Sequence, residues 1–87
     1  MQNPAMKYII IGDEEGYEFP ILFPTYWGHD EIARNVVEKR QWVLAAGFVR
    51  IGDGGEFVCL GGSRSLGIAA RPERDAKVIS TWMTTRA

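Results

Sequence analysis

The chain has 87 residues, of which 46% are hydrophobic and 24% charged, and its formal net charge is -1. This length and composition are typical of one globular domain, and they exclude a disordered chain, which combines low hydrophobicity with high net charge. The near-neutral charge also argues against binding nucleic acid by bulk electrostatics. We therefore expect a single domain over residues 1–87, with residues 1–5 loosely ordered.

The first half of the chain predicts two strands and then a helix. Residues 7–11 are rich in β-branched and aromatic side chains and run into a polar turn bounded by glycines. The alternation over 17–23 predicts a strand with one apolar face, and Pro20, which cannot donate to a sheet ladder, indicates an edge strand or a bulge. Residues 29–40 have apolar side chains at helical spacing, acids at the start and bases at the end, which favours a helix.

The second half predicts a hairpin, a further strand and a second helix. The apolar segments 42–51 and 56–60 flank residues 52–55, a turn whose glycines can adopt positive φ. Residues 66–70 alternate in the same way and predict a third strand of this meander. Pro72 suits the first position of a helix, and residues 73–83 carry an apolar stripe.

Together these elements predict an α+β fold. Their order is strand, strand, helix, strand, strand, strand, helix, and the short connections favour antiparallel neighbours. We expect a small antiparallel sheet of about five strands, with both helices packed on one face. The other face, or a sheet edge, would then be open to a partner or to a second copy of the chain.

Reactive side chains are too few and too scattered to predict an enzyme. His29 is the only histidine and has no nucleophile or second ligand at a suitable spacing. Cys59 is the only cysteine, and its apolar setting is typical of a small buried hydrophobe. The glycine-rich turns lack a phosphate-loop pattern, and no zinc spacing is present. We expect no catalytic residues, no metal site and no cofactor.

The cysteine content, the length of the apolar runs and the first residues of the chain favour a cytoplasmic location. A single cysteine excludes an intramolecular disulfide and fits a reducing compartment. The longest apolar run is far shorter than a membrane span, and the first residues lack the basic and apolar regions of a signal peptide. We expect no association with a membrane.

Aromatic and basic residues predict a surface that binds another protein. Tyr26 and Trp27 fall in a loop, and both residue types are enriched in binding hot spots; the alternative is that the rings cap the core. The segment 63–65 and two later arginines could form an anion-binding corner; the alternative is a solvated turn whose serines bond their own backbone. The predicted partner-binding residues are Tyr26, Trp27, His29, Arg64, Arg71 and Arg74.

Nucleic-acid binding is the alternative that the bases around the first helix leave open. Its candidate residues are Arg34, Lys39, Arg40 and Arg50. Residues 1–31 contain six acids and one base, whereas residues 32–87 contain nine bases and five acids. This asymmetry favours an oriented contact if the two ends form separate faces, but interleaved strands would mix the charges.

Three segments resemble small uncharacterised proteins encoded by tailed phages and prophages. They are AGF at 46–48, CLGGSRSLG at 59–67 and RPERDA at 71–76. The chain departs from the usual pattern at Arg74, which separates two acids that are often adjacent. The resemblance implies a cytoplasmic accessory protein that binds a host protein without catalysis, one candidate being an inhibitor of a bacterial defence system such as CRISPR-Cas. A nucleic-acid-binding accessory protein and a structural or oligomeric phage protein are the alternatives.

Overall fold

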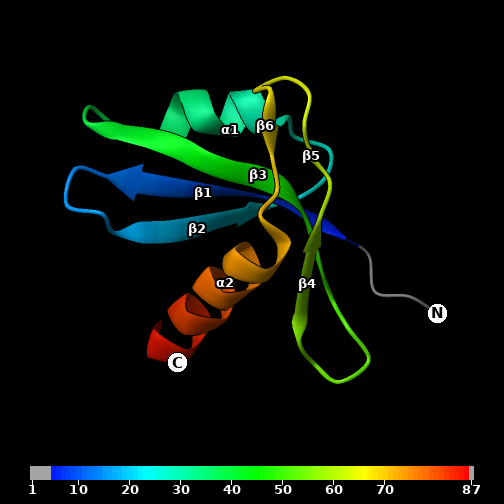
Figure 1. The fold of residues 1–87 in the computed structure, drawn as a ribbon. Helices are drawn as coiled ribbons and strands as arrows, with labels where there is room; N and C mark the ends of the chain where they lie inside the picture. The colour runs from blue at the N-terminus through cyan, green and yellow to red at the C-terminus, as the bar shows by residue number, and fades with distance from the viewer. Residues whose placement is uncertain (1–4, 87) are drawn as a thin grey trace.

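A computed structural model describes residues 5–86, the side chain of Arg86 excepted, so the expectation for residues 1–5 lies, apart from Ala5, outside the described residues. The elements are, in chain order, β1 (Met6–Asp13), β2 (Glu18–Phe23), α1 (His29–Val36), β3 (Gln41–Ile51), β4 (Phe57–Leu60), β5 (Gly62–Ser63), β6 (Ile68–Ala69) and α2 (Pro72–Arg86). Figure 1 shows their arrangement.

The main sheet confirms the predicted α+β fold. Within residues 5–86, four strands pair antiparallel in the order β2-β1-β3-β4, and β3 and β4 form the predicted hairpin. β1 is an inner strand, and its residues 8–11 are completely buried. β2 is an edge strand, as Pro20 indicated, because proline has no N–H to offer a second neighbour.

The two helices lie on opposite faces of the sheet, so the prediction that both cover one face is wrong. Ile79 of α2 shares a buried cluster with Ile10, whereas Ile32 of α1 shares another with Ile9 and Ile11. Successive side chains of a strand point to opposite faces, and the sheet accordingly separates α1 from α2 in Figure 1. The physical reason is the unbroken apolar run of β1, which needs cover on both sides.

The predicted third strand of the meander forms a separate ribbon instead. Among the described residues, β5 pairs with β6 alone, so the expected five-stranded sheet is a four-stranded sheet plus a two-stranded one. Gly61 adopts a φ of 80° and turns the chain out of the main sheet after β4. The ribbon packs against β3, and Leu66 and Ile68 pack against the apolar cluster on the α1 side.

Both predicted helices occur, but their ends differ from the prediction. α1 ends at Val36 and not at residue 40, because Val37 already has an extended backbone, with φ -79° and ψ 123°. Arg40 then adopts a left-handed φ of 65° where the chain turns into β3. α2 begins at Pro72, as predicted, and continues past residue 83 to Arg86. Over residues 5–86, neither helix has the length and apolar character needed to cross a bilayer.

Candidate functional site

Hydrogen bonds and ion pairs join β1, β2 and α2. Asp75 is completely buried, and its Oδ2 accepts bonds from the Tyr8 hydroxyl at 2.5 Å and from the backbone N–H of Arg71 at 2.7 Å. Its Oδ1 accepts a bond from Nε of Arg71 at 2.9 Å. The two oxygens of Glu18 accept one bond each, from Arg71 at 2.8 Å and from Arg74 at 2.5 Å. These contacts fix α2 across the start of β2.

The pKa shifts in this cluster follow from burial and from these bonds. Burial raises the pKa of the Tyr8 hydroxyl far above its usual value, and the hydrogen bond to Asp75 raises it further. Burial also raises the pKa of the Cys59 thiol to about 11. Hydrogen bonds from Arg74 and Arg71 lower the pKa of Glu18, although partial burial opposes them. At neutral pH, Tyr8 and Cys59 are therefore protonated, while Glu18 is ionised and paired.

Tyr26 and Trp27 form an exposed aromatic pair in the loop between β2 and α1. Tyr26 is 77% exposed and Trp27 48%, and their rings meet edge to face with centroids 5.8 Å apart. Nζ of Lys7 donates a hydrogen bond to the carbonyl of Trp27 at 2.8 Å, which ties this loop to β1. We call the surface formed by Tyr26, Trp27, Lys7 and Arg64 the aromatic corner.

A pocket of about 470 Å³ lies next to this corner. Two members of the corner, Lys7 and Arg64, line it together with Phe48 and the first turn of α1, whereas Tyr26 and Trp27 do not. Asp30 also lines it, but this acid is paired with Arg34 at 3.4 Å. Within residues 5–86, neither Lys7 nor Arg64 has an ion-pair partner. The pocket therefore has two cations without an ion-pair partner among the described residues, and Lys7 links it to the loop that holds Tyr26 and Trp27.

His29 also lines this pocket, but its ring is buried and makes its contacts within the fold. It is only 4% exposed, and its Nε2 donates to the carbonyl of Gly47 at 2.9 Å, since a carbonyl can only accept. Phe23 and Phe48 contact the ring edge to face, with centroids 5.5 and 5.8 Å away. His29 thus anchors the start of α1 to β3 and presents little surface to a partner.

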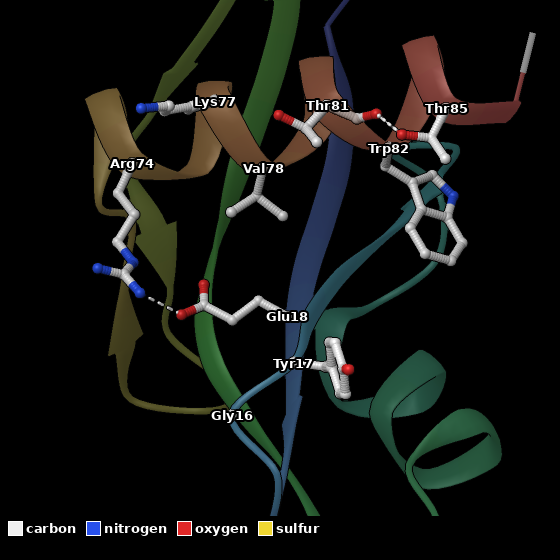
Figure 2. A pocket seen from close by; sticks show the side chains of 9 residues that line it. All are labelled: Gly16, Tyr17, Glu18, Arg74, Lys77, Val78, Thr81, Trp82 and Thr85. Carbon is white, nitrogen blue, oxygen red and sulfur yellow. Dashed lines mark hydrogen bonds and ion pairs between the residues drawn. The ribbon is translucent and has the colours of Figure 1, made fainter.

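A second pocket, of about 440 Å³, opens between α2 and the turn that leads into β2. Figure 2 shows Val78 and Trp82 projecting from α2 toward the strand, while the Glu18 side chain reaches toward Arg74. Gly16 and Tyr17 supply the facing wall, and Lys77 and two threonines complete the helix side. We call this pocket the α2 groove; the sequence analysis did not identify it.

The structure gathers four of the predicted partner-binding residues and places two elsewhere. Tyr26, Trp27, His29 and Arg64 lie at or beside the aromatic corner. Arg71 directly precedes α2, Arg74 lies on it, and both bond to Glu18. Arg64 lines different pockets from Arg74, so the three arginines do not form one anion-binding corner. The Ser63 hydroxyl accepts a bond from the Leu66 N–H at 3.1 Å. This is the type of contact expected from the alternative prediction, a turn whose serines bond their own backbone.

The bases considered for nucleic acid do not form one patch. Arg34 is paired with Asp30, and Arg40 is 3.5 Å from a carboxylate oxygen of Glu14. Lys39 and Arg40 precede β3 while Arg50 lies near its far end, and a strand of 11 residues separates its ends by roughly 30 Å.

The Glu14–Arg40 and Glu18–Arg74 pairs join the acidic first third of the chain to the basic remainder, so interleaving mixes the charges.

Over residues 5–86, no group of three or more His, Cys, Asp or Glu side chains is arranged to hold a metal ion. The chain matches no family model, no curated protein and no solved structure with which it was compared.

Proposed function

We propose that this protein is a phage or prophage accessory protein that binds a bacterial host protein through the aromatic corner, and that it acts by occupying the partner's surface. The observation that carries this proposal is the exposure of Tyr26 and Trp27 next to a pocket lined by Lys7 and Arg64, which have no ion-pair partner within residues 5–86. Tyrosine, tryptophan and arginine are enriched in binding hot spots. The two aromatic residues bury much area and lose little conformational freedom.

The corner also defines the chemistry of the partner. Covering the two rings requires an apolar recess on the partner. Lys7 and Arg64 require carboxylates at its rim, and the guanidinium of Arg64 suits a bidentate contact. The partner surface is thus an apolar patch bordered by acidic residues.

Two further observations support a binding role over catalysis. The groups with the most reactive chemistry, Tyr8, Cys59 and His29, are buried, and Tyr8 and His29 are hydrogen-bonded within the fold. The resemblance to phage and prophage proteins supports a host protein as the partner. A component of a bacterial defence system, such as a CRISPR-Cas complex in the host cytoplasm, is the class we propose.

Affinity capture from a lysate of the bacterial host, quantified by mass spectrometry, tests this proposal. The double variant Tyr26→Ala/Trp27→Ala removes the exposed pair. The matched control is Tyr17→Ala/Trp42→Ala, which removes a tyrosine that is 67% exposed and a tryptophan that is 47% exposed. We expect the wild type and the control to recover the same acidic-surfaced protein and the corner variant to lose it. Recovery of no stable partner, or equal loss by both variants, would contradict the proposal.

A further inference from the structure

The α2 groove has the size and lining of a small-molecule site, and it is distinct from the aromatic corner. Its volume of about 440 Å³ falls within the range of sites that hold small ligands. No residue of the aromatic corner lines it. We propose that the α2 groove binds a small organic anion, consisting of one carboxylate on an aromatic or aliphatic body.

The body of the ligand would contact aromatic and aliphatic side chains. Val78 and Trp82 lie one turn apart on α2 and form the helix side of the groove, and Phe19 packs against the Trp82 ring at a centroid distance of 5.9 Å. Tyr17, which is 67% exposed, lies on the facing wall. A flat apolar group placed between Tyr17 and Trp82 would bury the exposed surface of both rings.

The charges around the groove select for an anion. Two of its lining residues are cations, Arg74 and Lys77, and one is an acid, Glu18. Both oxygens of Glu18 already accept hydrogen bonds, and its side chain is only 14% exposed, whereas that of Arg74 is 65% exposed. Within residues 5–86, Lys77 has no ion-pair partner. A carboxylate would find free N–H donors on both cations, while a cationic ligand would be repelled.

The position of the cations fixes the orientation of the ligand. Arg74 and Lys77 are three residues apart and therefore neighbours on the surface of α2, whereas Trp82 lies more than one turn further along the helix. The carboxylate would lie at the Arg74 end and the apolar body at the Trp82 end. The ligand would thus lie along the helix axis.

Three probes of related structure test the chemistry: 3-phenylpropionate, 3-phenylpropylamine and acetate. Each is titrated into the full ¹⁵N-labelled chain, and the indole Nε1–H signal of Trp82 is followed by NMR. We expect saturable shifts with 3-phenylpropionate and a dissociation constant on the order of 1 mM, as suits so small a ligand. The dissociation constant of the amine should be at least about tenfold higher than that of 3-phenylpropionate. Acetate should cause no saturable shift. Equal shifts from the acid and the amine, or shifts centred on another part of the chain, would overturn the proposal.

Variants at exposed positions test the residues. Lys77→Glu should weaken 3-phenylpropionate binding about tenfold, whereas Lys39→Glu, which reverses an exposed lysine outside the groove, should change it less than about twofold. Tyr17→Ser should weaken binding, and Tyr26→Ser should leave it unchanged. Arg74 is left intact because it bonds to Glu18. If each pair of variants behaves alike, the α2 groove is not the site. These titrations do not involve a host protein, so their result does not depend on the capture experiment. Either proposal can therefore fail while the other holds.

Discussion

The hydroxyl of Tyr8, in an inner strand of the sheet, donates a 2.5 Å hydrogen bond to the carboxylate of Asp75 in α2, 67 positions further along the chain. Both residues are completely buried, and Asp75 also accepts two bonds from Arg71. A buried carboxylate is tolerated only when hydrogen bonds replace its lost hydration. The Tyr8–Asp75 bond therefore specifies where α2 lies on the sheet. Apolar packing alone is not directional and would restrict the position of the helix less.

Replacing Tyr8 by phenylalanine should destabilise the fold by about 1–3 kcal/mol, because it removes one hydrogen bond from a buried carboxylate while leaving most of the ring packing in place. The free energy of unfolding, measured with urea, checks this. Tyr17→Phe, in which the lost hydroxyl belongs to a residue that is 67% exposed, should change stability by less than about 0.5 kcal/mol. Equal effects of the two substitutions would show that the buried bond contributes nothing specific.

Stability should fall in acid partly through Glu18, whose pKa in the folded chain is lowered by its bonds to Arg74 and Arg71. Because the folded pKa lies below the unfolded value near 4.3, the unfolded chain binds the proton first, and acid favours unfolding. The contribution is present above the unfolded pKa and is lost as pH falls through the folded pKa. Urea unfolding between about pH 5 and about pH 3 should show a flatter dependence for Glu18→Gln than for wild type. A slope for Glu18→Gln as steep as that of the wild type would contradict this contribution.

Cys59 should be unreactive until the chain unfolds. It is buried, and burial raises the pKa of its thiol to about 11, so on the order of one molecule in a thousand carries the thiolate at pH 8. Labelling with iodoacetamide should be far slower in buffer than in urea, and its rate should follow the unfolded fraction. Native labelling at the rate of an unstructured cysteine peptide would mean that β4 does not protect the thiol.

Gly47 should not tolerate a larger side chain, because a Cβ there would lie 2.6 Å from the backbone oxygen of Leu60 and 3.0 Å from Cβ of Ala70. Its carbonyl also accepts the bond from His29. We expect Gly47→Ala to destabilise the chain by about 1–3 kcal/mol in urea unfolding, since the backbone must move. Gly54→Ala, in the exposed turn of the hairpin, should cost less than about 0.5 kcal/mol. The same small loss at both positions would contradict the close packing at Gly47.

Local patterns were enough to predict most elements, the α+β class and the edge position of β2. Alternation predicted β2, the glycine turn predicted the hairpin, and Pro72 predicted the start of α2. The opposite placement of the helices was also detectable, because residues 8–11 are apolar without a break, as strands covered on both faces are. The error came from expecting the sheet as a whole to have only one apolar face.

The sites depend on contacts that no local pattern contains. Asp75 reads as an ordinary acid in the first turn of a helix, and only the fold brings the Tyr8 hydroxyl to it. The helix side of the α2 groove could have been found from the shared helical face of residues 74, 77, 78, 81, 82 and 85. Its other wall comes from the turn before β2, more than 50 positions earlier, as the separation of 56 between Glu18 and Arg74 shows.

The dissociation constants of Trp27→Ala and Trp42→Ala for the captured host protein test the central claim most directly. The two tryptophans are almost equally exposed, at 48% and 47%, and only Trp27 lies at the aromatic corner. If the corner is the binding surface, Trp27→Ala should weaken binding about 30-fold or more, as expected for a hot-spot residue, while Trp42→Ala stays within about twofold of wild type. Similar dissociation constants for the two variants would contradict the assignment of host-protein binding to the aromatic corner.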